Sequence, residues 1–233
     1  MGTRREAMRS TERLSAEDVG PLAWLAALLL AVVIPLSFAA AGDGVLPGDV
    51  AVARWMQRAG LGPVAGTLAE AGYWLGSTPG AALLAGVAAL LFWSAGRPTA
   101  VWLVLAAGLL RSLNPLLKRL AESPRPTADL VRVTEDAPGY GFPSGHAMGV
   151  VLVFGSAAIV VQDQVEHRGV RWAVWTISVL AMIVTGFGRV FSGAHWPSDV
   201  LGGYLWGTFL LLVLLTGARL ARRSSPRRTP RRH

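Results

Sequence analysis

Eight residues in three separate segments have the types and the spacing needed to bind a phosphate and transfer it. The first segment holds two cations, the second a Ser-Gly-His run, and the third an arginine, a histidine and an aspartate. In chain order they are Lys118 and Arg125; Ser144, Gly145 and His146; and Arg189, His195 and Asp199. No other lysine occurs in the chain, and two of its four histidines belong to this set.

The first chemical function that these residues predict is binding of an anion. Guanidinium groups match phosphate oxygens bidentately, and Ser144-Gly145 comes directly before an expected helix, where free N–H groups and the helix dipole attract phosphate. Gly145 lets an oxygen approach the backbone closely, and Ser144 can cap the helix or donate a hydrogen bond. Such groups stabilise the charge that spreads over three equatorial oxygens during phosphoryl transfer.

The second chemical function is nucleophilic attack by an imidazole. His195 and Asp199 are four residues apart, with Pro197 at a position that suits the start of a helix. An aspartate there can accept a hydrogen bond from one ring nitrogen, fix the tautomer and leave the other nitrogen free to attack. His146 is then the natural general acid for the leaving oxygen.

Each segment taken alone has a simpler structural explanation. A cation at the end of a membrane span is usually an interface anchor, and Asp199 could be an ordinary charge at a helix N-terminus. A single interfacial histidine is more often structural than catalytic, and Ser-Gly before a helix is a common cap. The functional interpretation therefore depends on all three segments meeting on one face.

The composition indicates the elements that must position these residues. The chain has 233 residues, of which 52% are hydrophobic and 15% charged, and it has no cysteine. The absence of cysteine excludes disulfides and thiolate sites. The hydrophobic fraction is large enough for roughly six spans of about 20 residues. We expect an all-α polytopic membrane protein with six transmembrane helices in a bundle. The spans are expected at Pro21–Ala41, Pro79–Ala95, Thr99–Leu120, His146–Val161, Trp172–Val190 and Val200–Ala218.

The remaining segments are assigned as follows. Leu61–Ser77 carries Glu70 in its middle and is predicted to be an outer interfacial helix, with a re-entrant segment as the alternative. Residues 1–20 are expected to be a cytoplasmic leader, 21–218 the membrane domain and 219–233 a basic cytoplasmic tail. The first span could instead be a cleaved signal peptide, because Ala39-Ala40-Ala41 resembles a cleavage site.

The distribution of Lys and Arg predicts the orientation. With both termini cytoplasmic, the inner segments hold 14 basic residues and the outer segments seven, as the positive-inside rule requires. The three chemical segments then lie on the outer face. Seven arginines between Arg219 and the C-terminus are expected to bind anionic lipids rather than nucleic acid, since the tail has no aromatic residue to stack on bases.

Two further patterns predict how the site is supported. Arg111, Asn114 and Lys118 share one face of the third span, so we expect a polar support inside the bundle beneath the site. Gly145-x3-Gly149 and Gly203-x3-Gly207 fit close helix packing and are expected to bring the fourth and sixth spans together.

The three-part pattern Lys118-x6-Arg125-Pro126, Pro143-Ser144-Gly145-His146 and Arg189-x5-His195-x3-Asp199 resembles the signature of the type 2 phosphatidic acid phosphatase superfamily, in its integral-membrane bacterial branch. The resemblance implies that His195 is the nucleophile, Asp199 its orienting partner and His146 the acid. It implies that Lys118, Arg125, Ser144, Gly145 and Arg189 bind the phosphate, and that no metal or other cofactor is needed. One departure is Gly188, where the family usually has serine; Ser192 could replace that hydroxyl.

The resemblance implies a hydrolase of lipid phosphates or pyrophosphates in the plasma membrane. Undecaprenyl pyrophosphate is favoured, because carrier recycling takes place on the outer face, with phosphatidylglycerophosphate and phosphatidate as other candidate substrates. Two alternatives are a phosphotransferase, in which a lipid or sugar acceptor replaces water, and a non-catalytic lipid-binding membrane protein.

Overall fold

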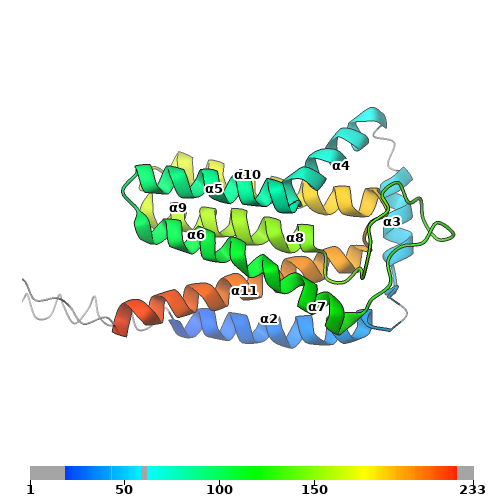
Figure 1. Cartoon of the computed structure of the whole chain (residues 1–233), viewed down its shortest axis with the longest axis horizontal. Coiled ribbons are helices and arrows are strands. Elements are labelled where there is room, and N and C mark those ends of the chain that lie inside the picture. The colour runs from blue at the N-terminus through cyan, green and yellow to red at the C-terminus, as the bar shows by residue number, and fades with distance from the viewer. Residues whose placement is uncertain (1–18, 43, 59–61, 225–233) are drawn as a thin grey trace, which may run out of the picture.

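Long apolar runs of this chain form long helices, because backbone N–H and C=O groups inside lipid must pair within their own segment. The computed structural model describes residues 19–42, 44–58 and 62–224, which contain helices and no strand. Five helical runs are long and apolar enough to cross a membrane: Gly20–Ala40, Pro98–Ala121, Gly145–Gln164, Arg168–Phe191 and Pro197–Ala221. They lie side by side in a bundle (Figure 1), which confirms the predicted all-α polytopic class.

A sixth candidate span consists of two helices joined at a bend. α4 (Gly62–Gly76) and α5 (Thr78–Ser94) meet at 65°, with Ser77 between them accepting a hydrogen bond from the Gly80 N–H at 3.1 Å. α5 corresponds to the predicted second span but has only 17 residues. α4 corresponds to the predicted interfacial helix; it leans away from the bundle axis in Figure 1 and packs against α10.

A second helix outside the bundle, α3 (Asp49–Arg58), was not predicted. It lies across the end of the bundle (Figure 1). Its first residue, Asp49, accepts hydrogen bonds from the Ser198 N–H at 2.9 Å and from the Ser198 hydroxyl at 2.6 Å. These bonds fix the start of α11 (Pro197–Ser224), the helix that carries Asp199.

Two of the predicted spans change their helical pitch partway. The third consists of α6 (Pro98–Leu110), a 3₁₀ turn η1 (Arg111–Leu113) and α7 (Asn114–Ala121). Pro115 explains that break, because proline cannot donate the hydrogen bond that would continue an α-helix. The fourth consists of α8 (Gly145–Val150), a π-helical segment η2 (Val151–Gly155) and α9 (Ser156–Gln164).

The first and last helices pair along the bundle. α2 (Val19–Ala40) packs on α11, and the Trp206 indole N–H donates to the Ser37 hydroxyl at 3.2 Å. α10 (Arg168–Phe191) lies beside α4 and α8. α11 continues past the predicted end at Ala218 to Ser224, so the first residues of the basic tail are helical. Most of the predicted leader and tail lie outside the described residues.

The predicted glycine packing is half right. A Cβ on Gly203 would lie 2.5 Å from the Ser144 carbonyl oxygen, and one on Gly207 would lie 3.0 Å from the Met148 carbonyl oxygen, so these two glycines do let α11 approach α8. The expectation for the glycines of α8 was wrong, because they face the other way. A Cβ on Gly145 would meet Asn114, and one on Gly149 would meet Arg111.

This packing predicts that Gly203→Leu destabilises the protein by about 1–3 kcal/mol, the usual cost of overpacking, and lowers its melting temperature. Gly217→Leu is the matched control on the same helix, because nothing lies within 4 Å of a Cβ at that position. Thermal unfolding in detergent measures both variants. Equal melting temperatures for the two variants would show that the stability of the protein does not depend on the close approach of α11 to α8 at Gly203.

Candidate active site

One face of the third span fixes the loop that leads into α8. Lys118 Nζ donates to the carbonyl oxygens of Tyr140 and, at 3.1 Å, Gly141. Asn114 Nδ2 donates to the Pro143 carbonyl at 3.1 Å. One helix face therefore holds several carbonyls of a loop that has no regular structure of its own.

Arg111 completes this support. Its Nε donates to the Gly145 carbonyl at 3.2 Å, its Nη1 to the Thr78 hydroxyl at 2.6 Å and its Nη2 to the Gly76 carbonyl at 2.9 Å. The guanidinium thus ties the start of α8 to the bend between α4 and α5. The predicted polar support formed by Arg111, Asn114 and Lys118 is present, and it acts on backbone carbonyls.

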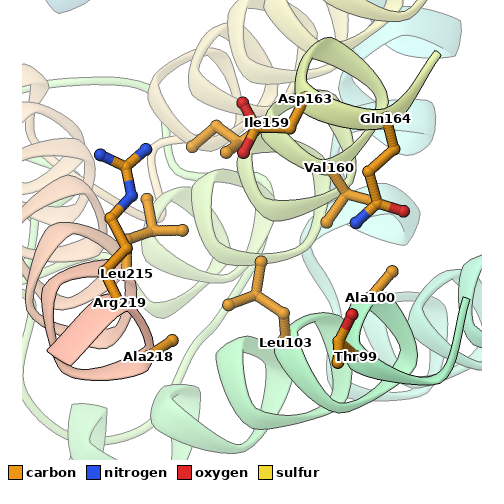
Figure 2. Close-up of a pocket in the computed structure, with 10 residues that line it drawn as sticks. All are labelled: Thr99, Ala100, Leu103, Ile159, Val160, Asp163, Gln164, Leu215, Ala218 and Arg219. Carbon is orange, nitrogen blue, oxygen red and sulfur yellow. The ribbon is translucent and has the colours of Figure 1, made fainter. Parts of the chain in front are cut away.

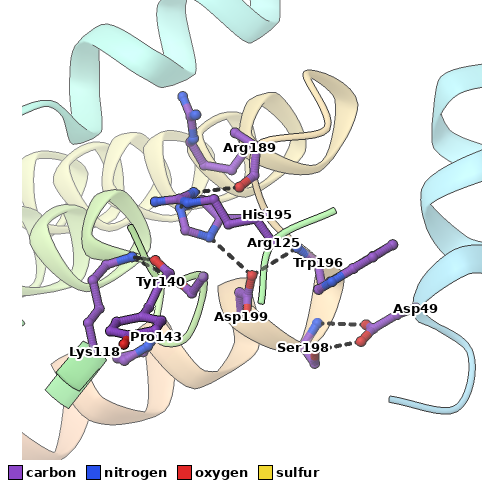
Figure 3. A network of polar contacts seen from close by, with 12 residues as sticks. Asp49, Lys118, Arg125, Tyr140, Pro143, Arg189, His195, Trp196, Ser198 and Asp199 are labelled. Carbon is purple, nitrogen blue, oxygen red and sulfur yellow. Dashed lines mark hydrogen bonds and ion pairs between the residues drawn. The ribbon is translucent and has the colours of Figure 1, made fainter. Parts of the chain in front are cut away.

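The centre of the site is a hydrogen bond between an imidazole and a carboxylate (Figure 3). Oδ2 of Asp199 lies 3.1 Å from Nδ1 of His195 and accepts a second bond from the Trp196 N–H at 3.0 Å. The backbone carbonyl of Asp199 accepts from the Ser144 N–H at 2.9 Å. Asp199 thereby joins the second and third sequence segments, and both it and His195 are buried.

Arg125 brings the first segment to the same place. Its Nη1 donates to the Ala194 carbonyl at 2.6 Å and lies 3.3 Å from Nε2 of His195. Its Nε and Nη2 donate to the carbonyls of Gly139 and Pro138, at 2.9 and 3.2 Å. With Asp199 on Nδ1 and Arg125 on Nε2, the neutral Nδ1–H tautomer satisfies both partners.

The electrostatic surroundings keep this imidazole neutral. Burial lowers the pKa of His195 well below its usual 6.5, and the charges of Lys118, Arg125, Arg189 and His146 lower it further. A neutral ring keeps an unshared pair on Nε2, which a nucleophile requires.

Arg189 approaches from α10 and is almost completely buried. Its Nη2 forms an ion pair with Oε1 of Glu135 at 2.6 Å, whereas its Nε and Nη1 are buried without a partner. Burying a guanidinium with two unsatisfied nitrogens is costly. The N–H groups of these nitrogens are suited to donate hydrogen bonds to the oxygens of a bound anion.

Two residues of this site were not found from the sequence. Glu135 lies in the loop between α7 and α8, and nothing in its neighbourhood of the sequence marks it. Tyr73 of α4 lies beside both the Arg189 guanidinium, at 5.4 Å from the ring centroid, and the His146 ring, at 5.2 Å between centroids. An aromatic residue on an amphipathic helix was the only signal available.

The first turn of α8 supplies further polar groups. Nε2 of His146 and the Ser144 hydroxyl are buried without hydrogen-bond partners. The first N–H groups of any helix, here those that follow Ser144, have no acceptor within the helix. The bond from the Ser144 N–H to the Asp199 carbonyl places this end of α8 beside the His195–Asp199 pair. The space that a Cβ on Gly145 would fill is occupied by the Asn114 side chain, whose Oδ1 would lie 2.7 Å away.

The departure at Gly188 has a packing reason. A Cβ at this position would lie 2.8 Å from the Ala69 carbonyl oxygen, so glycine lets α4 approach α10. The Ser192 hydroxyl, which was suggested as a replacement, donates to the Arg189 carbonyl at 3.4 Å.

A separate pocket of about 210 Å³ lies at the opposite end of the bundle, between α6, α9 and α11 (Figure 2). Its polar side chains are those of Thr99, Asp163, Gln164 and Arg219, and none of the predicted site residues lines it. This pocket is therefore separate from the predicted site.

The helices and side chains together define a polytopic membrane protein with a His–Asp pair set among cations. The family model described as the PAP2 superfamily matches residues 99–223. The chain therefore belongs to the PAP2 superfamily, as the three-part pattern predicted.

Named relatives extend this comparison. The chain is 29% identical over 136 residues to lipid phosphate phosphatase delta of Arabidopsis thaliana, covering 54% of this chain and 33% of that protein. It is 29% identical over 116 residues to phosphatidylglycerophosphatase B of Bacillus subtilis, covering 48% and 54%, and 28% identical over 71 residues to an undecaprenyl-diphosphatase of Sulfolobus acidocaldarius, covering 30% of each. The chain thus spans about a third to a half of the length of these relatives.

The fold is shared with a solved structure. A crystal structure of a transmembrane PAP2-type phosphatidylglycerolphosphate phosphatase from Bacillus subtilis matches 87% of this chain and 98% of that one, with a TM-score of 0.71 and 22% identity. This similarity establishes the multi-pass helical fold.

The geometry around His195 predicts its protonation state. In protein labelled with ¹⁵N-histidine, the signal that His195→Ala removes should show a neutral Nδ1–H ring at pH 6.5 and remain neutral below it, because the folded pKa is lowered. In the denatured chain the same residue should titrate near pH 6.5. A His195 signal that is already imidazolium at pH 6.5 in the folded protein would contradict this account.

Proposed function

We propose that the protein is a membrane phosphatase that hydrolyses a lipid phosphate or diphosphate through a phosphohistidine at His195. The observation that carries this proposal is the arrangement of His195, with Nδ1 on the Asp199 carboxylate and Nε2 facing Arg125. A buried neutral imidazole held in this way beside several cations is suited to attack a phosphoryl group. Membership of the PAP2 superfamily and the names of the relatives support the same reaction.

The first step forms the bond between Nε2 of His195 and phosphorus. The phosphorus–oxygen bond to the leaving group breaks, and His146 gives its proton to the leaving oxygen. Asp199 holds the Nδ1 proton and stabilises the positive charge that develops on the ring. Arg125, Arg189, Lys118 and the first-turn N–H groups at Ser144-Gly145 stabilise the equatorial oxygens.

The second step hydrolyses the intermediate. Water attacks phosphorus, His146 takes a proton from that water, and the bond to Nε2 breaks. Inorganic phosphate is released, and both histidines return to their starting protonation states. Each proposed step uses water, the side chains named above and the first N–H groups of α8.

Histidine variants test these roles. His195→Ala should lose phosphate release and all labelling of the protein by ³²P-phosphate esters. His146→Ala should slow hydrolysis of a lipid phosphate by about 10²–10⁴. It should slow phosphorylation by p-nitrophenyl phosphate much less, because nitrophenolate leaves without a proton.

The matched control for both is His167→Ala, since His167 caps α10 at the other end of the bundle through a 3.4 Å bond from the Val170 N–H. Activity of His195→Ala at the level of this control would refute the mechanism, and so would loss of activity when a chelator is added.

For the substrate, we propose undecaprenyl pyrophosphate ahead of phosphatidylglycerophosphate and phosphatidate, with both termini cytoplasmic and the site on the outer face of the plasma membrane. We expect the highest kcat/KM for undecaprenyl pyrophosphate when the purified protein is assayed on all three lipids in mixed micelles. A higher value for either other lipid would overturn this ranking. A labelled glycerol or sugar acceptor in the same assay separates hydrolysis from transfer, since transfer would place the label in a phosphorylated acceptor.

A further inference from the structure

Three arginines converge on a second pocket, at the end of the bundle that holds the His195–Asp199 pair. The pocket has a volume of about 270 Å³ and is lined by Arg54, Gln57, Arg58 and Arg132. Arg54 and Arg58 are one turn apart on α3, and Arg132 belongs to the loop between α7 and α8. None of these residues takes part in the proposed phosphatase mechanism.

The framework of this pocket is fixed by hydrogen bonds. Gln57 Nε2 donates to the Arg132 carbonyl at 2.7 Å, and Gln57 Oε1 accepts from the Arg132 N–H at 3.0 Å. Arg54 Nε donates to the Leu130 carbonyl at 2.7 Å. These bonds tie α3 to the loop and hold the three guanidinium groups around one space.

The three charges have no acidic partner among the residues that the structure describes. Arg54 and Arg58 use only Nε for hydrogen bonds to carbonyls, and Arg132 uses its guanidinium only to cover the Phe191 ring at 4.9 Å. Like charges one turn apart weaken a helix. Exposed terminal nitrogens on several converging guanidinium groups are suited to bind phosphate oxygens.

The position of α3 indicates what kind of phosphate compound can reach the pocket. The helix lies across the end of the bundle (Figure 1), and its Val52 and Trp55 side chains are 42% and 68% exposed. Exposed apolar side chains beside arginines on a helix of this orientation are typical of one that lies in a membrane interface. The pocket is then at the depth of lipid headgroups.

We propose that Arg54, Arg58 and Arg132 bind the phosphate of an anionic phospholipid in the leaflet that surrounds this end of the bundle. Binding needs no phosphatase activity, so it stands independently of the proposed function.

A consequence for the phosphatase does depend on the proposed function. The loop that carries Arg132 also bonds to the segment before His195, through the Thr134 N–H and the Ser192 carbonyl at 2.8 Å, and to Arg189 through Glu135. A lipid that bridges α3 and this loop should stabilise the segment and raise the rate of hydrolysis.

The binding test compares the full-length protein with Arg54→Gln/Arg58→Gln/Arg132→Gln. Native mass spectrometry after exchange into neutral detergent counts phosphatidylglycerol bound per protein, with phosphatidylcholine as the reference lipid. We expect the triple variant to lose one bound phosphatidylglycerol, with its affinity reduced about tenfold or more. The triple Arg→Lys variant should bind more phosphatidylglycerol than the Gln variant, because the charge remains, and less than the natural protein, because an ammonium group cannot form two parallel bonds to a phosphate.

Arg119→Gln is the control for an exposed arginine at the same end, on α7, and should bind like the natural protein. Circular dichroism and melting temperature verify that the triple variant is folded. Unchanged phosphatidylglycerol binding by the folded triple variant would overturn the proposal. So would displacement of the lipid by inorganic phosphate at an equal concentration, because the site would then recognise a free anion.

The activity test measures hydrolysis of dioctanoyl phosphatidate as phosphatidylglycerol is added to neutral micelles. Phosphatidylglycerol should raise the rate of hydrolysis by the natural protein. The triple variant should have the same basal rate and show no increase. An active natural protein that binds the lipid but does not become faster would refute the coupling. A natural protein inactive on every phosphate ester would refute the proposed function and leave the binding result standing.

Discussion

The hydrogen bond between Asp199 and His195 is the interaction on which the arrangement of the site depends. One carboxylate oxygen accepts from both the imidazole and the Trp196 N–H, while the backbone carbonyl of the same residue accepts from Ser144. The position of Asp199 is set in turn by Asp49, which binds both the N–H and the hydroxyl of Ser198. A polar chain thus runs from α3 through the start of α11 to the start of α8. Because these groups are buried, each hydrogen bond is costly to leave unmade.

Much of this arrangement could be predicted from the sequence, because the relevant signals are local. Apolar runs locate the spans, and the spacing of His195 and Asp199 places both at one helix start. The shared face of Arg111, Asn114 and Lys118 follows from helical periodicity, and the structure shows what that face binds. The family pattern also predicted that the three segments meet.

What could not be predicted depends on contacts between distant segments. α3 is short, and it is held by contacts with residues 130–132, with Phe191 and with Ser198, all distant in the sequence. Glu135 lies in a loop with no periodicity, so its pairing with Arg189 has no sequence signal. The neighbours of Gly145 and Gly149 were also predicted wrongly, because they too depend on contacts between distant segments. A pattern of small residues predicts that a helix face is closely packed but does not identify the neighbour that packs on it.

The contact between Arg125 and Nε2 of His195 has a consequence for selectivity. In the resting protein this guanidinium covers the atom that attacks in the proposed mechanism. In that mechanism, a phosphoryl group whose oxygens compete for Arg125 would also free Nε2, so that substrate recognition and activation of the nucleophile would be one event. A molecule that enters the site without an anionic group to attract Arg125 meets a nucleophile whose lone pair is still engaged.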